Sequence, residues 1–143
     1  MRPPDLPASV AFVVEVSRGA WAKRAPDGRV EFPSPVPCPF NYGSAPGHPS
    51  ADGEPADVVV LGPTLPRGHR GHLPVVGRVR FRDAGLPDDK WICAQTPPGR
   101  RDRARLRAFF ITYALLKRIT APIRRTSADS RFITLELFGP IPR

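Results

Sequence analysis

The most informative stretch of the sequence is Asp52-Gly53-Glu54-Pro55-Ala56-Asp57, which leads directly into the apolar run 58–61. Three carboxylates fall within six residues, beside a run that is typical of a buried strand. Like charges this close repel one another, so an ionised cluster of this kind needs a cation among its carboxylates. Mg²⁺ prefers oxygen ligands and often bridges carboxylates to phosphate. A metal site of this kind would need further carboxylates elsewhere in the chain, together with cations that bind phosphate.

Length and composition indicate one globular domain. The chain has 143 residues, and its 20 prolines and 12 glycines stand beside a hydrophobic content of 41%. Such a balance is typical of short strands joined by many turns. We expect an irregular tail over residues 1–9 and a single domain over residues 10–143.

No apolar run approaches the ~20 residues of a membrane span, and the N-terminus has no signal-peptide pattern. We therefore expect a cytoplasmic protein without a membrane partner. Cys38 and Cys93 have neither CxxC spacing nor a disulfide framework around them, so we expect two reduced, buried thiols.

Positive charge is concentrated in one segment. Of the net charge of +9, the residues from Arg100 to Arg125 supply nine Lys or Arg against Asp102 alone. A positive field of this kind attracts nucleic acid, another polyanion or an acidic partner. The segment is more typical of a solvated helix face with flanking loops, because charge alone reads no base sequence.

The first strand is expected at Val10–Val16, with Glu15 near its end. Glu15 has two interpretations: a functional carboxylate, or a group at the exposed strand end paired with a nearby basic residue. A turn at residues 26–28 predicts a hairpin, with Lys23 on its incoming arm and Arg29 on its return.

The segment Pro33–Pro49 contains six prolines. Because proline has no amide donor, we expect an ordered extended loop that presents Tyr42, and not an interior strand. The residues Gly62–Leu73 are also expected to form a surface loop. Val75–Phe81 alternates in the manner of a strand whose wet face carries Arg78.

A second acidic group, with Asp83, Asp88 and Asp89, precedes Lys90 and a strand at residues 91–94. Both acidic groups therefore lie at strand ends. In a small antiparallel barrel several strand ends meet on one side, which would bring the two groups to a shared metal. Two ordinary acidic turns are the alternative, since turns favour Asp and Gly.

Residues 101–119 show the spacing of one amphipathic helix, which we expect to pack on the barrel. Tyr113 falls on or near its apolar stripe, whereas Lys117 is placed elsewhere on the helical wheel. Pro122 is expected to end the helix, and a last strand is expected at Phe132–Phe138.

The order of these motifs resembles the soluble family I inorganic pyrophosphatases. The resemblance spans roughly residues 10–116 and consists of VVEVSRG, a lysine eight residues after Glu15, CPFNYG, DGEPAD followed by VVVLG, FRDAGLPDDKWI and FFITY. It implies a β-rich α+β fold, a small OB-like five-stranded barrel with a flanking helix. It also implies Mg²⁺-dependent hydrolysis of pyrophosphate to two phosphates, with several Mg²⁺ ions or Mn²⁺ as the alternative.

The resemblance assigns roles to individual positions. Its metal ligands would be Asp52, Asp57 and Asp88, with Asp83 for the metals that arrive with substrate. Its catalytic carboxylates would be Glu54, beside the attacking water, and Glu15. The groups that hold phosphate oxygens would be Lys23, Tyr42, Lys90, Tyr113 and, if one residue is inserted, Arg29.

The chain departs from the family pattern at four functional positions, which are Ala25, Cys38, Ala114 and Glu54. The first three replace a glutamate, a tyrosine and a lysine, and Glu54 replaces a shorter aspartate. Loss of one such donor or base commonly lowers a rate ~10²-fold or more, so we expect weakened activity. The alternative is an impaired relative that binds a polyanion or nucleotide through residues 100–125. We also expect a homo-oligomer, and we do not favour nucleic acid as the partner.

Overall fold

The computed structural model describes residues 6–20, 22–24, 30–33, 38–50 and 53–138, without the side chains of 22–24, 30–33 and 124. Within these residues one helix, α1 (Arg100–Arg124), accompanies a set of strands. The strands are β1 (Ser9–Val16), β2 (Ala22–Arg24), β3 (Val30–Pro33), β4 (Asn41–Pro49), β5 (Pro55–Val60), β6 (Arg70–Asp83), β7 (Leu86–Pro87), β8 (Lys90–Cys93) and β9 (Arg131–Leu137).

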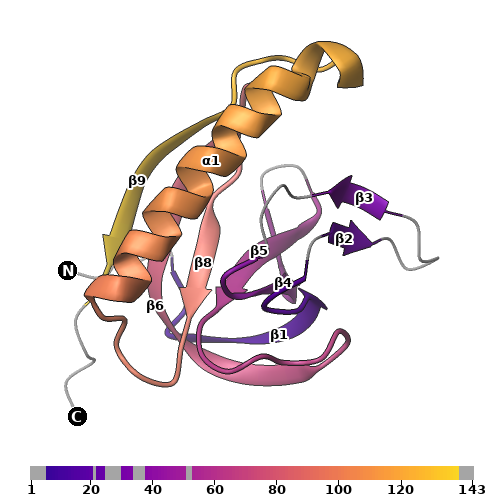
Figure 1. Cartoon of the computed structure of the whole chain (residues 1–143). Helices are drawn as coiled ribbons and strands as arrows, with labels where there is room; N and C mark the ends of the chain where they lie inside the picture. The colour runs from indigo at the N-terminus through magenta and orange to yellow at the C-terminus, as the bar shows by residue number, and fades with distance from the viewer. Residues whose placement is uncertain (1–5, 21, 25–29, 34–37, 51–52, 139–143) are drawn as a thin grey trace.

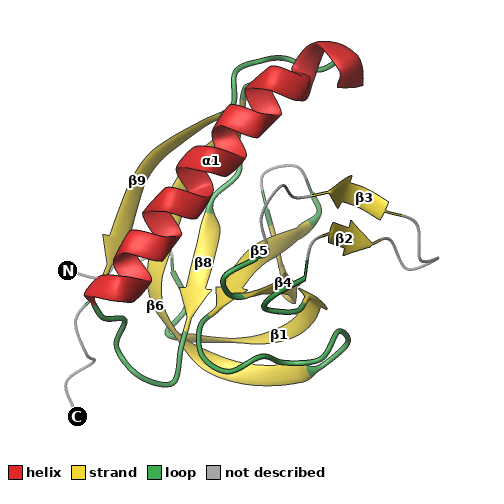
Figure 2. Cartoon of the chain, viewed as in Figure 1, coloured by secondary structure: helices red, strands yellow, loops and turns green. Residues whose placement is uncertain are grey.

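Five strands form a closed barrel in the order β1-β4-β5-β8-β6, and pairing of β1 with β6 closes it. β7 and β9 extend the sheet from β6, while β2 and β3 form a separate hairpin (Figures 1 and 2). The helix α1 packs on one side of the barrel, beside β9. The predicted β-rich fold, with a five-stranded barrel, a flanking helix and a hairpin at Lys23, is therefore confirmed.

One long strand closes the barrel. The first part of β6, Arg70–Pro74, pairs with β1, and its continuation pairs with β8 and with β9. The predicted strand at Val75–Phe81 was too short, and the predicted loop over Gly62–Leu73 was wrong from Arg70 onward. Gly71 and Pro74 caused the error, because both residue types are uncommon inside strands. Arg78 was wrongly placed on a wet face: it is 8% exposed, and its guanidinium donates to Glu136 of β9 at 2.8 Å.

The prediction of a loop over Pro33–Pro49 was wrong for its second half. The strand β4 lies between β1 and β5, and its residues Asn41–Ala45 pair with β5 in regular register. Pro46 and Pro49 follow this interior part, beyond the last residue of β4 that pairs with β1. Proline thus marks where β4 becomes an edge, which agrees with its missing amide donor.

Two apolar clusters lie on opposite faces of the barrel strands. Val58 and Val60 point into the barrel and pack with side chains from the other four strands. Val59, between them, belongs to the second cluster, which α1 covers with Leu106 and Phe110. Because side chains alternate along a strand, the face under the helix continues from Val59 to Asp57.

The helix α1 runs through Pro122 and ends at Arg124, so the prediction that Pro122 ends it was wrong. Proline near a helix end removes only one intrahelical hydrogen bond, and the turn is closed by the amide of Thr126 donating to Ala121. At the other end the amide of Gly99 donates to Asp102. No helix in the described part of the chain has the length and apolarity that a membrane crossing requires.

Gly43 provides a test of the barrel. A Cβ atom at this position would collide with the backbone oxygen of Val13 in the neighbouring strand, whereas a Cβ at Gly47 would meet nothing within 4 Å. We expect Gly43→Ala to lower the free energy of unfolding by about 3 kcal/mol, since backbone cannot yield as a side chain can. Denaturant unfolding measures the loss, with Gly47→Ala as the matched control. Equal stability of the two variants would contradict the register of β1 and β4.

Candidate active site

The centre of the site is an ammonium group held between two carboxylates. β5 and β8 are parallel, and their register places Asp57 opposite Lys90. The Nζ atom of Lys90 lies 2.7 Å from Oδ2 of Asp57 and 2.6 Å from Oδ2 of Asp88. The expected convergence of the two acidic groups is therefore present for Asp57 and Asp88, but parallel pairing produces it, because parallel strands begin at the same end of a sheet.

Burial and charge shift the pKa values in this group. Burial alone would lower the pKa of Lys90, but Tyr42, Asp57 and Asp88 raise it well above its usual value. Burial is the largest effect on Asp88 and raises its pKa; Lys90 acts in the opposite direction, and the charges of Asp57 and Asp83 add smaller increases. One ammonium thus neutralises two carboxylates incompletely, and the site retains an attraction for a further cation.

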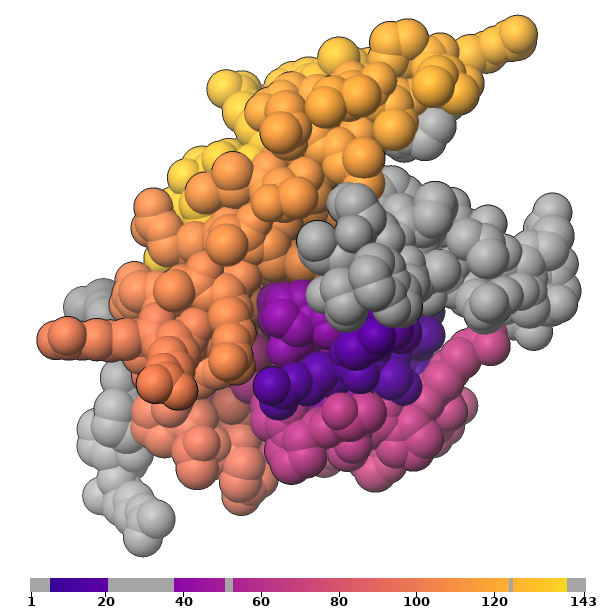
Figure 3. Space-filling view, in the orientation of Figure 1, coloured from indigo at the N-terminus to yellow at the C-terminus, as the bar shows by residue number. Residues whose placement is uncertain are grey.

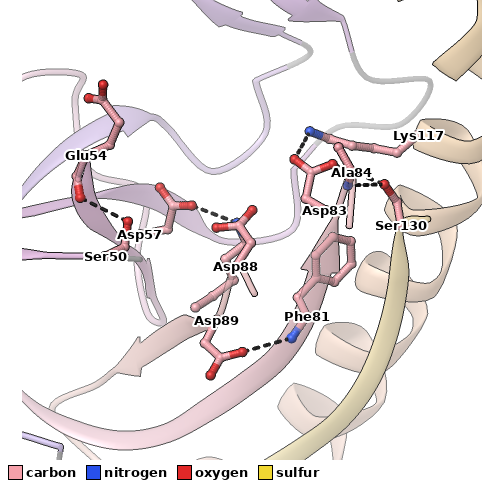
Figure 4. Close-up of polar contacts among 11 residues, drawn as sticks. Ser50, Glu54, Asp57, Phe81, Asp83, Ala84, Asp88, Asp89, Lys117 and Ser130 are labelled. Carbon is pink, nitrogen blue, oxygen red and sulfur yellow. Dashed lines mark hydrogen bonds and ion pairs between the residues drawn. The ribbon is translucent and has the colours of Figure 1, made fainter. Parts of the chain in front are cut away.

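Asp83 stands at the edge of this group, at the end of β6 (Figure 4). Ala84 and Gly85 both have positive φ, as in a tight type I′ hairpin turn toward β7. One oxygen of Asp83 accepts a hydrogen bond from Ser130, and the other lies 2.7 Å from the Nζ atom of Lys117. Ser130 in turn accepts from the amide of Ala84, which fixes the turn that carries Asp83.

Aromatic side chains surround the ammonium groups. The Nζ atom of Lys90 lies 5.9 Å from the ring centre of Tyr42 and 5.7 Å from that of Phe81. The Nζ atom of Lys117 lies 5.1 Å from the ring centre of Tyr113, which also packs against Phe81. Burial raises the pKa of Tyr42 well above its usual value, so its hydroxyl remains a hydrogen-bond donor at neutral pH.

The structure brings together Asp57, Asp88, Lys90 and Tyr42, with Asp83 and Tyr113 beside them. It does not bring Glu54 into this group: its side chain is exposed and extends away from Asp57 in Figure 4.

Four other predicted site residues are placed by their strand pairing alone or lie outside the described part of the chain. Glu15 lies at a bulge of β1, between the residues that pair with Tyr42 and Gly43 of β4. Lys23 pairs with Phe32 in the β2–β3 hairpin, and its side chain is not described. Asp52 and Arg29 lie outside the described residues, so their roles stay predictions.

Two polar side chains of the site were missed in the sequence. Lys117 was placed away from the apolar stripe of the helix, yet only 12% of its side chain is exposed. It follows Tyr113 by four residues, and this spacing puts the two side chains on one helix face. Ser130 is buried and holds Asp83, but a serine in a short connection carries no distinguishing signal in the sequence.

Cys38 stands where the resemblance would place a tyrosine. Its side chain is buried and donates to the backbone oxygen of Phe40 at 3.0 Å. Burial raises the pKa of this thiol to about 11 and that of Cys93 to about 12, so both stay protonated at neutral pH. The expectation of two buried, reduced thiols is confirmed, and Cys38 presents no strong donor to a phosphate.

The donor set fits a hard divalent cation. Asp57 and Asp88 each keep about a quarter of their side-chain surface exposed, and both already approach one positive centre through an oxygen. Within the described residues no three His, Cys, Asp or Glu side chains form a ready metal cluster. Asp57 and Asp88, with Asp83 nearby, are therefore the described groups that would hold Mg²⁺, which takes few protein ligands and keeps several waters.

A separate cavity of about 480 Å³ lies at the opposite ends of β5 and β8, where Val60 and Ala94 line it. Its lining is a mixture of apolar, histidine and arginine side chains with Asp102 as its carboxylate. The paired carboxylates and the buried lysine lie at the other end of these strands, which favours that end as the site of chemistry.

Comparisons with known proteins identify the family of the chain. The family model described as inorganic pyrophosphatase matches residues 12–122. An inorganic pyrophosphatase of Gluconobacter oxydans (strain 621H) is 33% identical over 98 residues, which are 62% of this chain and 56% of that relative.

Solved structures show the same fold. The inorganic pyrophosphatase from Thermus thermophilus matches with a TM-score of 0.71 at 23% identity, covering 94% of this chain and 86% of the other. That of Helicobacter pylori matches with a TM-score of 0.72 at 20% identity, covering 90% and 84%. Since the family match extends over most of the sequence and the barrel agrees with it, the chain belongs to the inorganic pyrophosphatase family.

Proposed function

We propose that this protein hydrolyses inorganic pyrophosphate to two phosphates. The observation that carries the proposal is the arrangement of Asp57, Asp88 and Lys90, two partly exposed carboxylates on one buried ammonium. Phosphoryl transfer depends mainly on positioning and on neutralising charge, and this arrangement offers both cation sites and a fixed positive charge. The family membership supports the same chemistry.

The side chains of the site have separable tasks in this proposal. Asp57, Asp83 and Asp88, with Asp52, would hold Mg²⁺ or, as the alternative ion, Mn²⁺. When bound, such ions place positive charge on phosphate oxygens and lower the pKa of water. Lys90 supplies a charge that needs no reorganisation, because its ammonium is already fixed by two ion pairs.

The phenols and the remaining predicted residues complete the assignment. Tyr42 would donate to a phosphate oxygen from its protonated hydroxyl, and Tyr113 would do so from the helix. Lys23 and Arg29 remain proposed phosphate contacts on the hairpin. Glu54 and Glu15 remain the proposed catalytic carboxylates.

We propose that the activity is weakened relative to a family member with the full set of groups. Ala114 is buried on the inner face of α1 and Cys38 keeps its proton in the core, so neither replaces the missing phosphate contact. Glu54 is longer than the expected aspartate and extends away from Asp57. Misplacement by about 1 Å at such a position lowers a rate roughly 10²-fold.

Release of phosphate from pyrophosphate tests the proposal directly. In the presence of Mg²⁺ or Mn²⁺ we expect hydrolysis by the wild-type protein and a loss of about 10²-fold or more in Asp57→Asn, which removes a charge that positions the cation. Asp102→Asn is the matched control, since Asp102 caps α1 beside the cavity at the opposite ends of β5 and β8. Equal rates for wild type and Asp57→Asn would contradict the proposal.

The alternative function is binding of a polyanion or nucleotide by the basic segment 100–125. Arg101, Arg103 and Arg105 are exposed along the first turns of α1 and make a strongly positive surface there. Wild-type protein that releases no phosphate yet binds RNA with an affinity that falls steeply with salt would favour this alternative.

We also propose that two copies of the chain associate through α1. Ile111, Leu115, Ile119 and Ile123 recur every four residues on its outer side and are each at least 48% exposed. The helix forms a broad part of the molecular surface in Figure 3. Residues four apart form the ridges through which helices pack on one another.

Charge argues for a second copy as the occupant of this ridge. Between residues 108 and 123 the charged residues are Lys117 and Arg118 alone. Lys117 points inward to Asp83, and Arg118 is held by a hydrogen bond to the backbone oxygen of Ser130. Two copies of a chain with a net charge of +9 can therefore meet here without opposing their arginines.

Light scattering tests this association. We expect wild type to have at least twice the mass of one chain and Ile119→Glu to shift toward the monomer, since the ridge would bury an unpaired carboxylate. Ile133→Glu on β9, where the side chain is 56% exposed, is the matched control and should keep the wild-type mass. A monomeric wild type would contradict the proposal.

A further inference from the structure

Lys117 is a charged side chain on the buried face of α1. Around it that face consists of Phe110, Tyr113 and Ala114, which pack on the barrel, and of the buried Ala121. Only 12% of the Lys117 side chain is exposed. A charge in such a position requires an anion within reach, because burial removes it from water.

Asp83 is the anion that Lys117 contacts. The Nζ atom of Lys117 lies 2.7 Å from Oδ2 of Asp83, while Ser130 donates to Oδ1. Figure 4 shows the ammonium approaching Asp83 from the helix, with Asp88 on the side of Asp83 that faces away from the helix. The ammonium is therefore at the edge of the carboxylate group and not at the protein surface.

The position of Lys117 relates to one departure from the family pattern. The residue after Tyr113 is Ala114, where a lysine was expected. Lys117 follows Ala114 by three residues, so both lie on one helix face, and the ring of Tyr113 lies under its ammonium. Lys117 therefore lies one turn along the helix from the position where a lysine was expected, and its ammonium reaches the edge of the site that holds Asp83.

Two partners compete for Asp83 in the proposed reaction. The proposed divalent cation and the ammonium of Lys117 cannot share one oxygen of Asp83 without bringing two positive charges together. The lysine side chain has a flexible four-carbon stem, so its ammonium can turn to another anion nearby. The anion that enters the site in this reaction is pyrophosphate.

We propose that Lys117 is a substrate-binding residue that contacts a phosphate oxygen of pyrophosphate and replaces the cation absent at Ala114. This inference rests on the proposed function, since it names a further contact of the same site. A competing explanation is that Lys117 only joins α1 to the barrel through Asp83. The two explanations differ in what removal of the ammonium does to substrate affinity.

Calorimetric titration with imidodiphosphate at saturating Mg²⁺ separates them, because this slowly hydrolysed analogue reports binding without turnover. We expect at least a 10-fold loss of affinity in Lys117→Met, the size typical of one lost charge-assisted contact. Lys117→Arg should stay within about 3-fold of wild type, because it keeps the charge. Arg18→Met, which removes one exposed charge beside the cavity at the opposite ends of β5 and β8, should bind as wild type does.

Affinity of Lys117→Met equal to that of wild type would overturn the inference, as would a loss confined to Mg²⁺ affinity. Lys117→Gln, whose amide can still donate to Asp83, gives the same comparison should the methionine variant not fold. Tight binding without phosphate release by wild type would overturn the proposed hydrolysis. The titration of the Lys117 variants would still decide whether Lys117 binds the analogue. Absence of binding by wild type would overturn both.

Discussion

The ion pairs of Lys90 with Asp57 and Asp88 hold the site together. They join the start of β5 to the loop before β8, and they do so around a side chain that is 2% exposed. Removing one partner of such a buried pair typically lowers stability by about 3–5 kcal/mol, because an uncompensated charge remains. Without a bound ion, the ammonium keeps two repelling carboxylates side by side. These ion pairs thereby keep the proposed cation site assembled.

Strand alternation explains why this site lies under the helix. The face that carries Val59 and Ile92 in the core carries Asp57 and Lys90 two residues earlier. Each of the two strands therefore changes from apolar to charged along one face. The same change occurs in α1, where the apolar residues that cover the core are followed by Tyr113 and Lys117. The helix thus contributes both to the core and to the site, and the rigid barrel fixes the position of each group.

Much of this arrangement could be predicted from the sequence, since the carboxylates flank apolar runs that alternate as strands do. The interior strand β4 could not, because its prolines suggest a loop and only the pairing shows that they follow the interior residues. The parallel pairing of β5 and β8 is a property of the whole topology and leaves no local pattern. Lys117 was assigned to the wrong face because the buried face of the helix was predicted from its apolar residues. A lysine counts as polar in such a pattern even where an ion pair allows it to be buried.

The central claim is that Asp57 and Asp88 serve a single cation. A double-mutant cycle on Mn²⁺ affinity, measured by electron paramagnetic resonance for Asp57→Asn, Asp88→Asn and the double variant, tests it most directly. Residues that share a partner couple by about 0.5–3 kcal/mol, whereas independent sites add within about 0.3–0.5 kcal/mol. We predict that the double variant loses less affinity than the sum of the single losses. Strictly additive losses would contradict the account, because they would place the two carboxylates in separate sites.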